Sequence, residues 1–216
     1  QTCALPIWSS YGDERRMPLR PPGVLLLGPI ELTWIVVVVG VALLMGFRSG
    51  AGVLAWLAVA GEAVGRGATV TMDLNVRPSL VSDFAGYKQR LDRCIDISHV
   101  VKMSIEDIAT LEQSRAVRAT ELTPGEVERL VEKYVADFLG RPACELVIIT
   151  FGDEGSRAFT KSGKATATIF APPVFGDTVG AGDTLMAAVL TLLAEQGNLK
   201  PGKLTALGDA ALAEML

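Results

Sequence analysis

Apolar and polar residues alternate in blocks along most of the chain, where short apolar runs are separated by longer stretches of helical periodicity. The apolar runs predict buried strands at 68–72, 99–102 and 146–150. Ala-rich or amphipathic stretches predict helices at 51–64, 87–95, 105–111 and 124–139. Strands that alternate with helices in this way form parallel sheets covered by helices. The pattern therefore predicts an α/β fold, to which segments 157–160 and 165–170 add an antiparallel hairpin.

Two of these helices are preceded by residues that can accept hydrogen bonds from the free N–H groups of a first turn. Ser104 precedes the helix at 105–111, and a hydroxyl at that position caps a helix. Thr123 is followed by Pro124 at the first helical position and by Glu126 at the third, which is the pattern of a capping box. The local sequence therefore predicts where both helices begin.

The first third of the chain is less regular and carries few charges. Residues 1–23 show no periodicity and contain several prolines, so we interpret them as a tail outside the domain, which would occupy 24–216. Apolar runs at 24–27 and 35–39 predict two paired strands. The uncharged run at 32–47 is shorter than the roughly 20 residues that span a membrane, which makes membrane insertion the minor alternative.

Composition narrows the class of protein. A chain of 216 residues, 50 % hydrophobic and 20 % charged, suits one packed domain and excludes disorder, and its net charge of -4 disfavours nucleic acid as a partner. Cys3, Cys94 and Cys144 are too far apart for a zinc motif or a disulfide framework, which favours the reducing cytoplasm. His99 is the only histidine, so we expect it at a loop or strand edge and expect any catalytic base to be a carboxylate.

The stretch 175–193, FGDTVGAGDTLMAAVLTLL, is the most informative part of the sequence, because a glycine-rich bend runs directly into an apolar helix. Backbone N–H groups of such a bend, together with the helix N-terminus, favour bound phosphate. Asp183 occupies the position at which a Walker loop has lysine, and the third glycine of a dinucleotide fingerprint is missing. Asp183 could accept the proton of a hydroxyl that attacks a γ-phosphate, or could simply cap the helix.

The segment DTVGAGD at 177–183 resembles the signature of the ribokinase-like (PfkB) carbohydrate kinases. Three further segments resemble family motifs in the same order, namely DLNVRPSL at 73–80, VKMSIEDIATL at 101–111 and TFGDEG at 150–155. The resemblance implies a three-layer α/β/α fold with a mostly parallel sheet. It also implies transfer of a phosphoryl group from ATP to a sugar hydroxyl in the presence of Mg²⁺.

The resemblance assigns the phosphoryl-transfer roles position by position. Asp183 would be the catalytic base, and the N–H groups of Gly180, Ala181 and Gly182 would hold the charge that develops on the transferred group. The residues expected at the nucleotide are Lys102, Ser104, Thr150, Gly152 and Gly155. The last three of these would border adenine and ribose, because glycines permit close approach of a ligand to the backbone.

The remaining predicted positions concern the substrate and metal ions. Asp73, Asn75 and Arg77 follow a strand at the end where open parallel sheets bind ligands, and would face the sugar or phosphate. The resemblance places Mg²⁺ near Asp107, which would hold it through water because this side chain is shorter than the glutamate found in the family. Asp177 would shape a loop that binds a monovalent cation such as K⁺ in many relatives. The alternatives are a solvated helix face for Asp107 and a plain turn for Asp177.

The resemblance covers about two thirds of the chain and leaves parts of the expected domain without a counterpart. We expect an incomplete domain, truncated at both ends, that lacks the N-terminal strands, the sugar-binding lid and a Gly-Gly substrate motif, and whose last helix opens around Leu204. Fructokinase or 2-keto-3-deoxygluconate kinase would be the activity, and the full-length protein could form a homodimer. An inactive fragment, or a membrane-associated module at 24–60 with a kinase-like scaffold, is the alternative.

Overall fold

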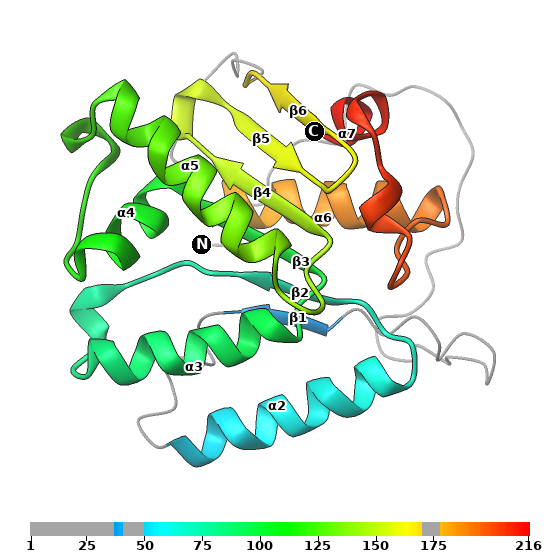
Figure 1. Cartoon of the computed structure of the whole chain (residues 1–216), viewed down its shortest axis with the longest axis horizontal. Helices are drawn as coiled ribbons and strands as arrows, with labels where there is room; N and C mark the ends of the chain where they lie inside the picture. Colours follow the sequence, from blue (N-terminus) through cyan, green and yellow to red (C-terminus); the bar gives the residue numbers. More distant parts are fainter. Residues whose placement is uncertain (1–36, 41–49, 170–177) are drawn as a thin grey trace, which may run out of the picture. The chain divides into compact units, whose positions relative to one another are not determined.

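A six-stranded sheet forms the centre of the computed structural model, which describes residues 37–40, 50–169 and 178–216 (Figure 1). The strands lie in chain order and are β1 (Val37–Gly40), β2 (Val70–Asp73), β3 (Val100–Ser104), β4 (Leu146–Thr150), β5 (Ser156–Phe159) and β6 (Lys164–Ala167). The first four strands are parallel, and β5 and β6 continue the sheet as antiparallel neighbours. The predicted mostly parallel sheet and the appended hairpin are therefore confirmed.

Helices cover this sheet on both sides. The helices are α2 (Gly50–Gly65), α3 (Phe84–Asp96), α4 (Ile105–Gln113), α5 (Pro124–Leu139), α6 (Ala181–Glu195) and α7 (Asp209–Met215). Short 3₁₀ turns occur at η2 (Pro78–Leu80), η3 (Ala119–Glu121), η4 (Gly152–Glu154) and η5 (Leu204–Ala206). Figure 1 shows α5 in front of the sheet and α6 behind it, and the packing of their side chains agrees.

The central strands are apolar throughout because both of their faces are buried. In β3, Val101 and Met103 pack with residues of α3, α4 and α5, whereas Val100 packs on the opposite face with residues of α6 and α7. In β4, Ile149 and Ile148 divide between the same two clusters. Successive side chains of a strand point to opposite faces, so one continuous apolar run serves two cores. This arrangement confirms the three-layer α/β/α fold.

The predicted N-cap at Ser104 and the predicted capping box at Thr123 are both present, and Ser104 also forms a capping box. The Ser104 side chain accepts the Asp107 N–H while Asp107 accepts the Ser104 N–H, and Thr123 and Glu126 exchange the same pair of bonds. Helix α3, in contrast, begins at Phe84, earlier than the expected 87, because Asp83 caps it by accepting the Gly86 N–H. A local acceptor can therefore start a helix before its apolar periodicity begins.

The ends of the chain correct several details of the prediction. The helix expected to open around Leu204 is a 3₁₀ turn in which Leu204 is fully buried, and α7 begins only at Asp209. Strand β6 ends at Ala167, sooner than expected. The described part of the strand expected at 35–39 belongs to β1, which pairs with β2, whereas 35–36, 24–27 and the tail at 1–23 lie outside the described residues. Among the described helices, none is long and apolar enough to cross a membrane.

Candidate functional site

The carboxyl ends of three neighbouring strands bring several of the predicted site residues to one edge of the sheet. Asp73 ends β2, Ser104 ends β3 and Thr150 ends β4. The first turn of α6 lies over this edge, because Gly182 approaches both Lys102 and Asp73. Ligands of open parallel α/β proteins bind at such an edge. The fold therefore places the glycine bend next to the strand-end residues.

Asp73 and Lys102 form an ion pair across β2 and β3. Their Cα atoms are register partners, and Lys102 Nζ lies 2.7 Å from Asp73 Oδ2. The Lys102 side chain is only 9 % exposed, and Asp73 Oδ1 has no hydrogen-bond partner among the described residues. Burial raises the pKa of Asp73 above its usual range; Lys102 opposes this shift, whereas the negative charges of Asp107 and Asp183 add to it. The carboxylate of Asp183 therefore acts electrostatically on the same small region.

The glycine bend begins α6 with an unusual backbone conformation. Gly180 is the N-cap residue at φ 80° and ψ 0°, which is left-handed, and a Cβ added there would meet nothing within 4 Å. Its carbonyl accepts both the Thr184 N–H at 2.8 Å and the Thr184 hydroxyl at 2.9 Å. Among the described residues, no side chain fills the space beside Gly180.

The three amide groups expected to hold phosphate differ in what they contact. The Ala181 N–H donates to the Thr178 carbonyl at 3.1 Å and is already occupied. The N–H groups of Gly182 and Asp183 belong to the first helical turn, which offers them no intrahelical acceptor, and none lies elsewhere in the described residues. The geometry therefore offers the amides of Gly182 and Asp183, rather than that of Ala181, as donors to an anion at this helix end.

Asp183 is exposed at the third position of α6. The helix has no side-chain capping hydrogen bond at its N-terminus, so the alternative in which Asp183 merely caps the helix has no support in this geometry. Among the described residues, the Asp183 carboxylate accepts no hydrogen bond, and the role of base assigned to it stays a prediction.

Asp107, in contrast, is occupied by the protein itself. It is 5 % exposed, and its Oδ1 accepts the Val76 N–H at 2.6 Å. Its Oδ2 accepts the Ser104 N–H at 2.9 Å and the Ser104 hydroxyl at 2.8 Å. These bonds tie α4 to the loop after β2, so the alternative of a solvated helix face is wrong. The magnesium role assigned to Asp107 stays a prediction.

The loop after β2 carries the other two expected substrate residues. Asn75 has a φ of 41°, an uncommon value for a residue with a side chain, and it is half-buried. Arg77 is exposed, and its Nη1 donates to the Val76 carbonyl at 3.2 Å. This contact leaves most of the guanidinium available to an anion, but the described contacts do not join Arg77 to Asp183. Asp177 lies outside the described residues.

The turn at 150–155 is explained largely by the protein backbone. The Thr150 hydroxyl lies 3.5 Å from the Met103 carbonyl, so it faces the neighbouring strand. Gly155 has φ 95°, and a Cβ there would overlap the Ala167 carbonyl of β6. Gly152 has φ 64° with open space around it. Gly155 is thus required by strand packing, a reason that the expected approach of a nucleotide did not include, whereas Gly152 leaves room for a ligand.

Two contacts at this edge were not foreseen. The pairing of Asp73 with Lys102 and the bond from the Val76 N–H to Asp107 both link segments far apart in sequence. A signal for the first exists, since an acidic and a basic residue near the ends of consecutive parallel strands can become register neighbours. The second has no sequence signal, because any residue offers a backbone N–H.

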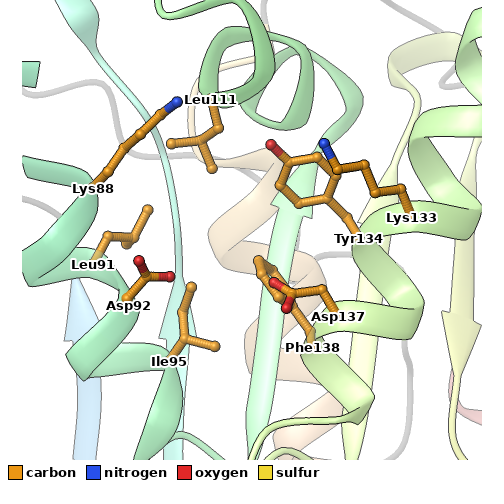
Figure 2. Close-up of a pocket in the computed structure, with 9 residues that line it drawn as sticks. All are labelled: Lys88, Leu91, Asp92, Ile95, Leu111, Lys133, Tyr134, Asp137 and Phe138. Carbon is orange, nitrogen blue, oxygen red and sulfur yellow. The ribbon is translucent and has the colours of Figure 1, made fainter. Parts of the chain in front are cut away.

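One pocket of the described residues lies away from the candidate site. It measures about 180 Å³ and lies mainly between α3 and α5, as Figure 2 shows. Its lining residues are Lys88, Leu91, Asp92, Ile95, Leu111, Lys133, Tyr134, Asp137 and Phe138. A second hollow, of about 410 Å³, lies beside His99 and Glu145. Neither is lined by a residue of the predicted site.

His99 occupies the opposite end of the sheet, immediately before β3, as predicted for a strand-edge residue. Its Nδ1 accepts the Val70 N–H at 3.1 Å, so the neutral ring is part of the strand pairing. Burial lowers the pKa of His99. This histidine therefore supports the strand pairing, at the end of the sheet opposite to the candidate site.

A mostly parallel sheet within three layers and an acidic residue on a glycine bend define an α/β protein with a candidate ligand site at the strand ends. A family model described as pfkB family carbohydrate kinase matches residues 48–209. The chain belongs to this family. The resemblance found in the four motifs is thereby confirmed.

Individual relatives agree with this assignment. A fructokinase of Rhizobium leguminosarum bv. trifolii is 32 % identical over 151 residues, which cover 70 % of this chain and 41 % of the relative. The structure of fructokinase with bound ATP from Xylella fastidiosa superposes with a TM-score of 0.60 at 19 % identity, over 82 % of this chain and 52 % of that one.

A double mutant of the Vibrio cholerae O395 fructokinase, in its fructose, ADP and potassium ion bound form, superposes with a TM-score of 0.55 at 22 % identity. The superposition covers 80 % of this chain and 49 % of that one. At this level of identity, both structures show the ribokinase-like fold alone. The chain spans about half of their length or less.

Proposed function

We propose that this chain carries the catalytic and nucleotide-binding part of an ATP-dependent sugar kinase, with fructose as the leading substrate. The observation that carries the proposal is the exposed carboxylate of Asp183, which follows a glycine bend at the carboxyl ends of the strands in a pfkB-family sheet. Relatives named fructokinase favour fructose over 2-keto-3-deoxygluconate. A cytoplasmic location and a homodimer of the full-length protein belong to the same proposal.

In the proposed reaction, Asp183 accepts the proton of a sugar hydroxyl as its oxygen attacks the γ-phosphorus of ATP. The bond between that phosphorus and the bridging oxygen of ADP breaks, so the phosphoryl group passes to the sugar and ADP leaves. The free amides of Gly182 and Asp183 would donate to oxygens of the transferred group, where negative charge is redistributed. Ser104, Thr150 and Gly152 would lie along the nucleotide, and Arg77 would reach the substrate or a phosphate.

Metal ions enter this proposal in a limited way. Within the described parts of the chain, no group of three His, Cys, Asp or Glu side chains could hold a metal ion directly, and both Asp107 oxygens already accept hydrogen bonds. The residues present therefore do not fit direct ligation of Mg²⁺, and we derive no step through it. The potassium ion in the name of the Vibrio cholerae structure supports a monovalent cation near Asp177.

An ADP-release assay with a panel of sugars tests the proposal. We expect turnover with fructose that falls about 10²–10⁴-fold in Asp183→Asn, because a general base contributes an effect of that size. ATP should raise the melting temperature of the unmodified chain and of Asp183→Asn, since binding to the folded state stabilises that state. Glu132→Gln, an exposed change on α5, is the matched control. Failure of every sugar to release ADP, together with no thermal response to ATP, would contradict the proposal.

Turnover that is unchanged in Asp183→Asn would remove Asp183 from the mechanism. A thermal response to ATP without turnover would instead favour the alternative of an inactive nucleotide-binding portion.

A further inference from the structure

Lys102 is a charged side chain in a place where charge is costly. The residue is 7 % exposed and stands on the same face of β3 as Val100, which packs against α6. Lysine is rarely buried to this extent unless it is paired. The pair it forms with Asp73 is weak evidence for stability, since a buried ion pair often adds no more than an apolar pair of the same volume. Its position beneath α6 therefore calls for a further reason.

That reason lies in the contact with Gly182. A Cβ added to Gly182 would come closer than 3.0 Å to Lys102 Nζ, and would lie 3.4 Å from Lys102 Cε and 3.8 Å from Asp73 Oδ2. The first turn of α6 consequently rests on the end of the lysine side chain, with no side chain between them. Any larger residue at 182 must lift the helix or displace the ammonium group.

The electrostatics of this contact point the same way. The N-terminus of a helix carries partial positive charge, so a lysine beneath it is unfavourable unless an anion holds it. Asp73 supplies that anion at 2.7 Å. The ammonium group, the end of a flexible side chain, is thus held in place by its ion pair with the sheet rather than by α6. The next residue of the same turn is Asp183.

We propose that Lys102, held by Asp73, is a positioning residue for the first turn of α6. Its contact at Gly182 sets the height of this turn above the sheet, and therefore the place of the Asp183 carboxylate and of the free amides relative to the transferred group. The inference rests on the proposed kinase function. It differs from the nucleotide-contact role assigned to Lys102 by resemblance, because the lysine acts through the helix.

A mutant cycle between positions 182 and 102 tests the contact. Gly182→Ala adds the colliding methyl group, and we expect kcat to fall at least about 10-fold while the KM for the sugar changes less than about 3-fold. Lys102→Met ends near the position of Cε, so it removes the atom that collides. Combined with Asp73→Asn, it also avoids an unpaired buried carboxylate. In this neutral background, we expect Gly182→Ala to lower kcat by less than about 3-fold.

Gly61→Ala is the matched control, because Gly61 also lies within a helix and a Cβ there would meet nothing within 4 Å. It should leave kcat unchanged. Losses that multiply in the cycle would overturn the inference. So would a nucleotide Kd that rises 10-fold or more in the neutral background, which would make Lys102 a direct ligand. A neutral background that keeps nucleotide affinity but loses turnover supports positioning.

The failure of the proposed function is distinguishable from the failure of this inference. If the unmodified chain shows no turnover with any sugar, the proposed function fails and the positioning role falls with it. If the unmodified chain is active and the losses multiply, only the positioning role is wrong. Melting temperatures of all variants establish that each one is folded during the assays.

Discussion

Replacing Asp107 by alanine should damage the fold more than any other change to a helix cap. The carboxylate accepts hydrogen bonds from the Val76 N–H, the Ser104 N–H and the Ser104 hydroxyl, and it is almost completely buried. The alanine variant leaves these donors without their acceptor, in a place where water replaces them poorly. It also separates α4 from the loop that carries Asn75.

The expected size of the effect follows from the three bonds. A hydrogen bond to a charged group contributes about 1.5–3 kcal/mol, and part of each loss is recovered when water reaches the donors. We therefore expect the free energy of unfolding to fall by about 3–5 kcal/mol for Asp107→Ala. With a urea dependence of about 2 kcal/mol per molar, the midpoint of unfolding would fall by about 1.5–2.5 M.

Urea unfolding followed by far-ultraviolet circular dichroism measures this difference. Glu126→Ala is the matched control, because Glu126 fills the same capping-box position on α5 but is exposed and accepts bonds only from Thr123. Its midpoint should move far less. Equal shifts for the two variants would refute the reasoning, since burial and the Val76 bond would then contribute nothing.

Three further outcomes follow from the described contacts. Because the pKa of His99 is lowered in the folded state, protonation favours unfolding, and the free energy of unfolding should decline as the pH falls below about 6.5. The variant His99→Asn can still accept the Val70 N–H, and its urea midpoints should depend less on pH. Burial raises the pKa of Cys94 to about 11 and that of Cys144 to about 12, so both thiols should be alkylated at pH 8 only on unfolding, as mass spectrometry would show. Arg141 pairs with three aspartates, and Arg141→Gln should lower the melting temperature, less so in high salt.

The sequence predicted the central part of the fold well, for reasons visible in single elements. Strand β4 was predicted with its observed bounds, because a short, continuous apolar run is typical of a central strand that is buried on both faces. Helices α4 and α5 start where Ser104 and Thr123 predict, since capping is a local interaction. The prediction of a helix around Leu204 was wrong. Leu204 lies in a 3₁₀ turn that its tertiary burial holds, and Gly208 is the N-cap residue of α7.

The candidate site could be predicted only as a set of residue types in order. The motifs singled out Asp73, Lys102 and the glycine bend separately, and only the structure shows that they lie together. The motifs could not show that Gly155 serves the packing of β6, because the strand that it contacts comes later in the chain. Nor could they show that Asp107 is saturated by backbone donors. Long-range contacts of this kind have no signature within one segment.

The order of the strands also bears on how the chain acquires its structure during synthesis. The order of β1 to β6 in the sheet is the order in which the ribosome synthesises them. Each new strand can therefore pair with the strand made just before it. The face that carries Val100, Leu146 and Ile148 must nevertheless wait for α6 and α7, which are made after all six strands. Until then this apolar surface is exposed to solvent, and we expect nascent chains halted before residue 181 to bind chaperones.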